Sequence, residues 1–536
     1  MKSIITFFAL FSVALLHAQW TADTDLNTLV AESGELDMQA KGTSDGQTYV
    51  VYWKNVGAPT NIELRLQVMD ANGNQKFGSD GMLVSDQIPM STSTVIMSTV
   101  VDADDHLYIG ATGTAGGDPA FVFKMDTDGN HLWGANGVQV GSGNVVTVLP
   151  LSTGGAIVSW LGSSGGVMQK YDGSGNSVWP TTMPIELSGS VTSPANFFEI
   201  SGGNFIVVFH KLLSGINSYL YAQRYDADGN PVWANPVQIA DRATAFIRSY
   251  KGVQDGDVVY MGYYASAGTR FDSYLQRINP DGTLPWGING SDFDVNETDY
   301  EMETEIAFEP GSQFIWSVAT YSNTSQSEKG EYVQKFDKDS GAREFTDNAK
   351  VVFPIASEKI HAGSLQLNNN TPLFIIKEGL DNGVSPVTLH SVYLDENGDF
   401  AWPEETRPVA TFSDSKSRIN FTKQAAMQSV AVFVEDKGSG QKIYAQNVVD
   451  DTAGVEELSN GSIFFANPVK ENMLIKSNSS IKEISISNVL GQQLFSAKYN
   501  GENTINIDAQ NWTSGIYFMN VSTNRGLEKG IKVIKQ

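Results

Sequence analysis

Over most of the chain, short runs of mainly apolar residues alternate with polar turns rich in Gly, Asn and Asp. Examples are Thr48–Trp53, Phe205–Phe209 and Val258–Met261, and most such runs follow a Gly-rich or Asp-Gly turn. This pattern predicts strands joined by hairpins, because Gly and Asn adopt positive φ angles at little cost. Eight runs of this kind recur along the chain, so we expect an all-β protein.

A longer repeat is superimposed on this alternation. A turn followed closely by an aromatic residue recurs seven times, and successive aromatic residues lie 46 to 59 positions apart. The turn reads Asp-x-x-Gly in five copies, Asn-x-x-Gly at Asn279 and Asp-x-x-x-Gly at Asp337. These aromatic residues are Phe77, Trp133, Trp179, Trp233, Trp286, Phe345 and Trp402. A β-patterned period of this length is typical of a β-propeller blade of four antiparallel strands, and it is too long for leucine-rich or ankyrin repeats.

The two ends of the repeat region predict how the ring closes. The last copy, Tyr444–Asp450, is not followed by an aromatic residue and an outer strand, whereas Trp20 lies 57 residues before Phe77 and precedes the strand-like segment Leu26–Val30. We therefore predict an eight-bladed propeller over residues 19–452, in which the first mature strand completes the last blade and removes an exposed sheet edge. A seven-bladed ring is the alternative.

The repeat resembles the tryptophan-docking repeat of quinoprotein dehydrogenases and related eight-bladed propellers. The most similar copy is Asp337–Phe345, in which Phe stands in place of Trp. The resemblance implies a fold and a packing role for the Trp residues between blades. Quinoprotein alcohol dehydrogenases typically hold their cofactor with a vicinal disulfide and a calcium site, but this chain contains no cysteine. We therefore predict no cofactor.

The N-terminus has the pattern of a signal peptide over residues 1–18. Lys2 precedes an apolar run from Ile4 to Leu16, and Ala18 suits cleavage before Gln19. Thirteen apolar residues are too few to span a bilayer, and no later run is long enough for a transmembrane segment. The formal charge of −25 makes nucleic acid an unlikely partner, because acidic surfaces repel phosphate backbones.

The sequence changes character after the repeats. A small polar linker over residues 453–462 is followed by a β-patterned segment, 463–536, which we expect to form a small β-sandwich domain. This segment holds eight Lys and Arg against five Asp and Glu, a formal charge of +3. The preceding residues 19–462 hold 26 basic and 55 acidic residues, a formal charge of −29.

Residues 463–536 resemble the type A C-terminal sorting domain of the Bacteroidota type IX secretion system. Five ordered motifs carry the resemblance, and their key residues are Asn467, Pro468, Leu490, Gly491, Gly515, Tyr517, Lys532 and Lys535. The resemblance implies that the domain binds the type IX machinery, and that the protein passes through the periplasm to be secreted or placed on the outer cell surface. An ordinary carbohydrate-binding or adhesion sandwich is the alternative.

Residue patterns for catalysis are scarce. The five mature histidines are His106, His131, His210, His361 and His390, and none lies in an HExxH motif. No GxSxG elbow or P-loop is present, so we predict no catalytic residues. His131 is expected to be a surface residue beside a turn.

Acidic residues offer the only candidate metal pattern. The turns that begin at Asp126 and Asp226 lack the EF-hand order and favour hairpins over calcium sites. The acidic run Asp292–Glu303 is expected to be a solvated loop and strand face, and it is the best place to look for a cation. We predict no metal site.

Two functional classes remain, and both use the propeller face that carries the long, variable loops. These loops are Val56–Asn61, Leu212–Ser218, Ala265–Asp272, Ser322–Glu331 and Gly379–Val387, together with the segments Ser85–Thr92 and Asn296–Thr304 between blades. We favour a non-catalytic binding or adhesion protein that engages a glycan or an envelope protein there. The alternative is a secreted polysaccharide lyase or hydrolase with an active site on the loops.

Overall fold

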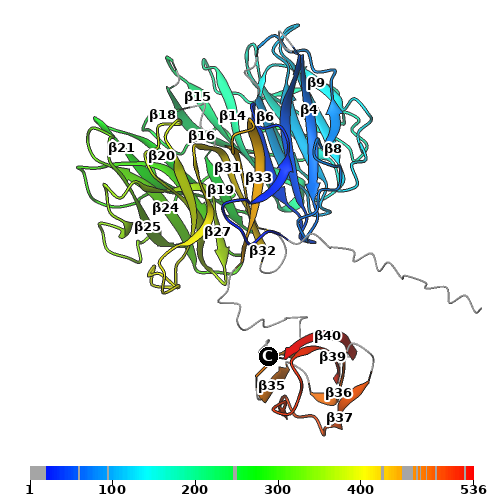
Figure 1. The fold of residues 1–536 in the computed structure, drawn as a ribbon. Coiled ribbons are helices and arrows are strands. Elements are labelled where there is room, and N and C mark those ends of the chain that lie inside the picture. The colour runs from blue at the N-terminus through cyan, green and yellow to red at the C-terminus, as the bar shows by residue number, and fades with distance from the viewer. Residues whose placement is uncertain are drawn as a thin grey trace, which may run out of the picture. The chain divides into compact units, whose positions relative to one another are not determined.

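The alternating segments form strands in a computed structural model of the chain, in which almost every element is a β-strand (Figure 1). The structure describes residues 20–57, 61–92, 96–215, 217–245, 250–423, 428–449, 463–465, 469–470, 472–477, 480–488, 492–523 and 527–535. Apart from one 3-10 turn, η1 (Ser201–Gly203), these residues contain no helix. Accordingly, no described helix has the length and apolar character needed to cross a membrane. The all-β prediction is confirmed.

Eight sheets follow one another along the described part of residues 20–449, and we number them as blades 1 to 8. Blade 1 contains β2 (Met38–Gly42), β3 (Thr48–Gly57), β4 (Asn61–Met69) and β5 (Met82–Ser85). Blade 2 contains β6 (Ile96–Val101), β7 (Leu107–Thr112), β8 (Pro119–Met125) and β9 (Val138–Ser142). Blade 3 contains β10 (Asn144–Pro150), β11 (Ala156–Gly162), β12 (Gly165–Tyr171) and β13 (Met183–Pro184). Blade 4 contains β14 (Thr192–Ile200), β15 (Asn204–Leu212), β16 (Asn217–Tyr225), β17 (Val237–Gln238) and β18 (Thr244–Ala245).

The second half of the ring repeats the same antiparallel order. Blade 5 contains β19 (Lys251–Asp255), β20 (Val258–Ala267), β21 (Arg270–Ile278) and β22 (Ser291–Asp292). Blade 6 contains β23 (Tyr300–Ala307), β24 (Phe314–Ser322), β25 (Lys329–Asp337) and β26 (Lys350–Phe353). Blade 7 contains β27 (Lys359–Asn368), β28 (Thr371–Glu378), β29 (Val387–Tyr393) and β30 (Arg407–Asp414). Blade 8 contains β31 (Lys416–Lys423), β32 (Gln428–Asp436), β33 (Gln441–Val449) and, from the N-terminus, β1 (Thr28–Ala31).

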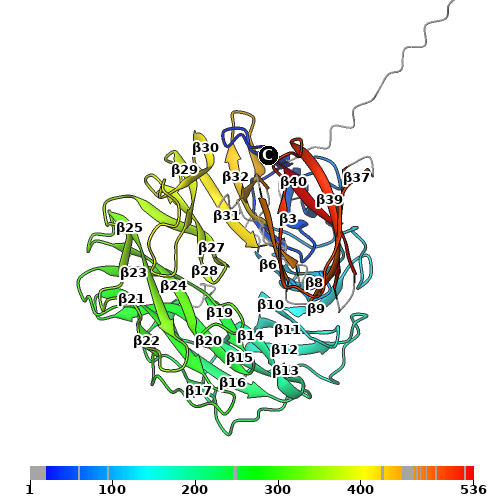
Figure 2. The same cartoon turned by 90° about the horizontal axis from the view of Figure 1, so that it is seen from below.

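The innermost strands gather around the centre of the ring (Figure 2), and hydrogen bonds between them join neighbouring blades. The Gln39 side chain donates to the Met97 carbonyl at 2.8 Å, and Gln366 donates to the Phe421 carbonyl at 3.0 Å. The ring closes where β31 lies beside β2, and the Ala40 amide donates to Oδ1 of Asn420 at 3.2 Å. The first strand of each blade therefore faces the central channel.

Tryptophans connect five pairs of neighbouring blades at the periphery. Trp133 Nε1 donates to the Gly173 carbonyl at 3.1 Å, and the indole ring covers Gly175 so closely that a Cβ there would lie 2.8 Å from the ring. The indoles of Trp20, Trp179, Trp233 and Trp286 make the same hydrogen bond to the turn of the following blade. The Asp-x-x-Gly turn is thus the docking surface for the preceding aromatic residue.

The hydrophobic core lies between adjacent blades. The second strand of a blade is apolar on both faces because another sheet packs on each side, and Tyr49, Val50, Val51, Tyr52 and Trp53 of β3 are all buried. At the closure, Val30 and Ala31 of β1 pack with side chains from blades 1 and 8. The N-terminal strand is therefore part of the core of the ring.

The chain divides between Val448 and Val449 into two compact units. The second unit holds β34 (Ile463–Phe464), β35 (Asn472–Ser477), β36 (Ile481–Asn488), β37 (Gln493–Lys498), β38 (Thr504–Asp508), β39 (Gly515–Thr523) and β40 (Leu527–Lys535). They form two sheets, in the orders β34-β35-β38 and β37-β36-β39-β40. Apolar side chains from both sheets form one core, as expected for a small β-sandwich.

Candidate functional site

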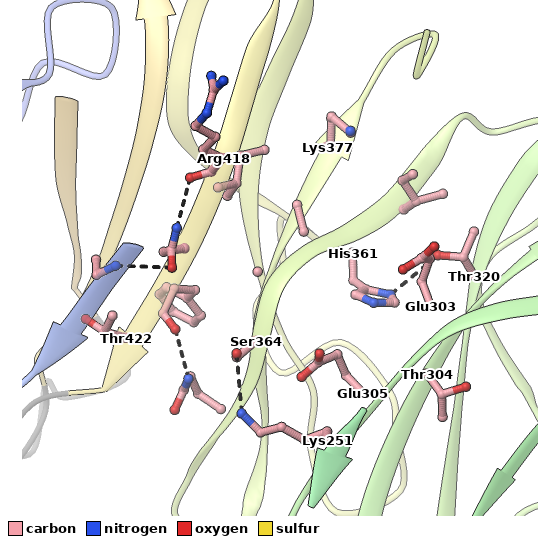
Figure 3. A pocket seen from close by; sticks show the side chains of 18 of the residues that line it. Lys251, Glu303, Thr304, Glu305, Thr320, His361, Ser364, Lys377, Arg418 and Thr422 are labelled. Carbon is pink, nitrogen blue, oxygen red and sulfur yellow. Dashed lines mark hydrogen bonds between the residues drawn. The ribbon is translucent and has the colours of Figure 1, made fainter. Parts of the chain in front are cut away.

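The central channel of the propeller holds a cavity with a volume of about 710 Å³. Its walls come mainly from the innermost strands β2, β19, β23, β27 and β31, so blades far apart in the sequence contribute to one site. This volume lies within the range of ligand sites in proteins. Asp381 of the loop after β28 also lines it, so the channel extends to the face that carries the long loops. Figure 3 shows side chains of the wall.

The channel is basic although the protein is acidic. Seven Lys and Arg residues line it, against three Asp and Glu residues. The basic residues are Lys41, Lys251, Lys329, Lys377, Lys416, Arg418 and Lys423, and the acidic residues are Glu303, Glu305 and Asp381. The whole chain has a formal charge of −25. The channel therefore offers anions an environment opposite to that of the outer surface.

Three inner strands are interrupted by irregularities that redirect side chains in the channel. The register shifts between Met302 and Glu305 in β23, between Ala362 and Gln366 in β27, and between Ser417 and Asn420 in β31. At these positions Glu303 has φ +53°, Gly363 has φ +77° and Arg418 has φ +50°. Positive φ is unfavourable for residues other than glycine, and bulges and such strain concentrate at functional sites.

A buried histidine and a buried glutamate form an ion pair in the channel wall. Nδ1 of His361 lies 2.7 Å from Oε1 of Glu331, and the His361 amide donates to Oε2 at 3.0 Å. Burial alone would lower the pKa of His361, but the charge and hydrogen bond of Glu331 raise it to about 9. The imidazole is thus a cation at neutral pH.

Two lysines from opposite parts of the ring interact electrostatically in the channel. Burial and the charge of Lys251 lower the pKa of Lys41 to about 8, against the opposing effect of Glu305. Lys251 donates to the Ser364 hydroxyl at 3.4 Å, and Figure 3 shows the Glu305 carboxylate directed toward this same region. Among the described residues, Nζ of Lys41 has no hydrogen-bond or ion-pair partner, and Oε2 of Glu305 is buried without a hydrogen bond. These groups are available for a ligand.

The other channel lysines are engaged by protein groups. Lys416 pairs with Glu435 at 2.6 Å, and both side chains are fully buried. Lys329 lies 3.2 Å from Asp381, and Lys377 also pairs with Asp381. These pairs hold the wall and the mouth of the channel in place, which leaves the Lys41 region as the part with unpaired groups.

The acidic run Asp292–Glu303 is only in part the solvated face that the sequence predicted, since Glu297 and Glu303 are exposed but two of its acidic residues are buried. Asp294 and Glu301 are each only 1% exposed, because the segment turns inward against blades 5 and 6. Asp294 accepts from the Tyr321 hydroxyl at 2.7 Å, and Glu301 accepts from the Ser273 amide at 3.0 Å. Burial, and then the charge and hydrogen bond of Asp294, raise the pKa of Glu301 far above its usual range. Glu301 is therefore a protonated hydrogen-bond donor at neutral pH.

A second cavity of about 400 Å³ lies beside this buried acidic pair, and both acids and bases line it. Asp272 pairs there with Arg270 at 2.7 Å and with Arg242 at 3.6 Å. Burial and the charges of Asp272 and Asp294 raise the pKa of Asp292 to about 7. The two arginines already neutralise Asp272, so the cluster is a mixed charge network.

The Asp carboxylates of the Asp-x-x-Gly turns accept hydrogen bonds from backbone amides of the same turn. Oδ1 of Asp126 accepts from the amides of Asp128 and Asn130 at 3.0 and 2.8 Å, and Asp226 does the same in blade 4. Among the described residues, one group has the geometry for a metal ion, namely Asp102, Asp104 and His106. Lys124 already pairs with Asp102 at 3.2 Å.

Histidine 131 is more enclosed than the sequence predicted. Its ring lies 6.5 Å from that of Phe123, and Nδ1 is buried without a hydrogen bond. Burial lowers the pKa of His131, so its imidazole is neutral at neutral pH. His131 therefore packs against Phe123 of its own blade.

The loops that connect the second and third strands differ from expectation in blade 5. Strands β20 and β21 extend through most of Ala265–Asp272, which leaves only a two-residue turn. In blades 6 and 7 the connections after Ser322 and Glu378 are longer. The variable part of this face therefore lies beside the channel wall that holds His361.

Half of the predicted sorting residues fall on described strands. Gly515 pairs with Lys535, and Tyr517 is buried with its hydroxyl donating to the Thr513 carbonyl at 2.8 Å. Lys532 pairs with Phe518 across β39 and β40. The other predicted residues lie outside the described residues, namely Asn467, Pro468, Leu490 and Gly491.

The sandwich leaves an apolar strip on its outer face. Leu494, Ile516 and Phe518 are each about two-fifths exposed. A groove of about 510 Å³ runs beside the strip, between the segment after Asn488 and the start of β39. A strip of this kind is a common feature of interaction surfaces.

Residues 463–536 match the family described as "Secretion system C-terminal sorting domain". This match confirms the predicted type IX sorting domain, and the protein is therefore secreted or located at the cell surface. No curated protein matches the chain at a significant level.

Solved structures resemble the chain only distantly. A puromycin hydrolase shares 11% identity at a TM-score of 0.37, over 78% of this chain and 62% of that chain. Prolyl oligopeptidase B from Galerina marginata shares 13% identity at a TM-score of 0.41, over 74% of this chain and 54% of that chain. A eukaryotic initiation factor shares 9% identity at a TM-score of 0.39, over 88% of this chain and 91% of that chain. The chain thus spans about half to two-thirds of the two hydrolases, and we draw no functional argument from these similarities.

Sequence reasoning did not select Lys41, Lys251, Glu305 or His361. A usable signal existed, because each lies in the first strand of its repeat, and in a propeller those strands face the channel. Lys41, for example, stands just before the Gly-rich turn that starts the second strand of blade 1. What the sequence does not contain is the pairing of blade 1 with blades 5, 6 and 7 across the channel.

Proposed function

We propose that this protein is an exported, non-catalytic binding protein whose propeller holds a polar ligand in its central channel. The observation that carries the proposal is the channel of about 710 Å³, with an excess of basic groups and with unpaired groups at Lys41 and Glu305. Buried polar groups without partners are costly, so a ligand that supplies the missing partners gains affinity.

We further propose a division of labour along the chain. Residues 1–18 would be the signal peptide, 19–452 the binding body, 453–462 the linker, and 463–536 the address for the type IX machinery in a Bacteroidota cell. The partner of the body would be a glycan in preference to an envelope protein, because the channel wall is rich in hydroxyl and charged groups and is too enclosed for a flat protein surface. We also propose that the repeats are related to quinoprotein-like repeats. The tryptophans that donate hydrogen bonds to the turn of the next blade support this relation.

A secreted polysaccharide lyase or hydrolase is the second candidate. The observation in its favour is Lys41, whose pKa of about 8 lets part of the amine be neutral and able to accept a proton near neutral pH. We favour binding because neither lysine of the Lys41 region is held by a hydrogen bond to a carboxylate that would orient a catalytic base.

The two candidates are separated by an experiment on the mature chain. Binding to an array of neutral and acidic glycans is measured together with release of reducing ends from the bound polysaccharides. The variant Ser364→Trp fills the channel, and Ser174→Trp places the same side chain in an exposed turn between β12 and β13, away from the long loops, as a matched control.

We expect binding without product, loss of binding in Ser364→Trp and retention in Ser174→Trp, with circular dichroism confirming that both variants fold. Product formation would instead establish the enzyme. Undiminished binding by folded Ser364→Trp would place the ligand outside the channel and refute the proposal.

A further inference from the structure

We propose that Lys41, Lys251 and Glu305 form a subsite for a uronic acid residue. The lysines bind the carboxylate of the sugar, and Glu305 accepts a hydrogen bond from a neighbouring hydroxyl of the same sugar. This inference rests on the proposed channel function and assigns the ligand class, an acidic oligosaccharide. The three residues come from β2, β19 and β23, so blades 1, 5 and 6 assemble the subsite across the channel.

The lysines supply the reason for an anion. Lys41 and Lys251 act on each other as like charges, and such an arrangement in a partly enclosed site is unfavourable without a counter-charge. Glu305 is the acidic residue that acts on Lys41, and one carboxylate does not balance two ammonium groups. A carboxylate placed between the lysines would supply the missing charge and a partner for Lys41 Nζ.

The unpaired oxygen of Glu305 indicates that the ligand carries a hydroxyl group beside its anionic group. Oε2 of Glu305 is buried and accepts no hydrogen bond from any described residue. A carboxylate oxygen in this state requires a donor, and a simple inorganic anion has none to offer. A uronic acid carries hydroxyl donors on the ring that bears its carboxylate, so one residue of the ligand satisfies both requirements.

The remaining wall fits a sugar chain. The Ser364 hydroxyl lies at the subsite, where it accepts from Lys251, and the channel volume exceeds what a single small acid would fill. The acidic outer surface repels anions at long range, so selectivity for an acidic sugar must come from short-range contacts inside the channel.

The test measures affinity of the mature chain for two α-1,4-linked probes, trigalacturonate and maltotriose, by isothermal titration calorimetry. We expect trigalacturonate to bind and maltotriose to bind at least tenfold more weakly. Lys41→Gln and Lys251→Gln should each lower the affinity for trigalacturonate about tenfold, which is the usual effect of losing one charged hydrogen bond. Lys54→Gln is the matched control, since Lys54 lies on β3 of blade 1 and pairs with Asp80.

Glu305→Gln separates the hydroxyl contact from the charge effect. Glu305→Gln should lower the affinity for trigalacturonate, because the carboxylate that accepts the hydroxyl hydrogen bond is lost. A site that only attracts anions would instead bind trigalacturonate more tightly once this negative charge is removed. Sodium sulfate serves as the simple-anion probe, and we expect it to compete weakly.

Equal affinity for the two trisaccharides, or unchanged trigalacturonate affinity in folded Lys41→Gln and Lys251→Gln, would overturn the subsite. These outcomes differ from failure of the channel proposal. If Ser364→Trp abolishes binding while the lysine variants bind normally, the channel is the site and the uronate assignment is wrong. If Ser364→Trp binds normally, the channel itself is not the site.

Discussion

The indole ring of Trp20 lies directly on Gly73, where an added Cβ would be only 2.8 Å from Cδ2 of the ring. Nε1 of the same indole donates to the Ala71 carbonyl at 3.0 Å. Trp20 thereby takes the place in blade 8 that Trp133 or Trp233 takes in its own blade. The first described residue of the chain and the first blade are thus joined by the contact that joins the other blades.

The Trp20 contact predicts a large effect of Gly73→Ala. Gly73 has φ +84°, and Ala in the left-handed region costs about 1–2 kcal/mol, to which the clash with the indole adds about 1–3 kcal/mol. Gly78→Ala is the control, since Gly78 has φ +69° and open space around it, so only the backbone cost of about 1 kcal/mol applies. Urea unfolding measures both, and equal losses would show that Trp20 does not press on Gly73.

Removal of residues 19–32 should open the ring. The deletion exposes the edge of β33, with which Thr28 and Leu29 pair, and uncovers the core around Val30. We expect the melting temperature to fall by several degrees, or the protein to aggregate. Differential scanning calorimetry with light scattering checks this, and an unchanged melting curve would mean that β1 contributes nothing to closure.

Glu301→Gln should make stability less dependent on pH. Because the pKa of Glu301 is raised in the folded state, its contribution is fully present below the unfolded value of 4.5 and declines as pH rises toward the raised folded value. Gln keeps the neutral, hydrogen-bonding shape of the protonated acid. The melting temperature of the wild type should fall more between pH 5 and 9 than that of Glu301→Gln, and the exposed Glu297→Gln should behave as the wild type does.

The ion pair of His361 and Glu331 predicts a second pH effect. The folded pKa of His361, about 9, exceeds the ordinary 6.5, so this stabilisation is complete below pH 6.5 and is lost as pH rises to about 9. Glu331→Gln should cost about 3 kcal/mol at pH 6, because the buried imidazole loses the carboxylate that stabilises its charged form. Proton NMR of the imidazole should then show titration below pH 6.5. Titration near 9 in the variant would contradict the assignment of the shift to Glu331.

Deletion of residues 463–536 should separate export from folding. The propeller has its own core and closes without the second unit, so we expect it to fold and remain in the periplasm. Cell fractionation and circular dichroism are the measurements. A reporter fused behind a signal peptide and in front of 463–536 should leave a Bacteroidota host cell. Normal secretion of the truncated protein, or its failure to fold, would contradict the assigned role.

Much of the fold was predictable because it is encoded locally and repeated. The segments Thr48–Trp53 and Phe205–Phe209 lie within β3 and β15, since turn residues and alternation act over a few positions. The turn of Asp126 forms within itself, because its carboxylate accepts hydrogen bonds from amides two and four residues away. Asp294 and Glu301 were misjudged for the opposite reason, since their burial depends on Tyr321 and Ser273, which are distant in sequence.

The sequence by itself determined the repeat, the tryptophan and turn pairs and the sorting domain, because each depends on the order and spacing of nearby residues. Only the tertiary structure decided the site. Lys41 and Lys251 are 210 positions apart, and they act on each other because closure of the ring turns the first strand of every blade toward one axis. The charge balance of the channel is a sum over these blades, so no single repeat contains it.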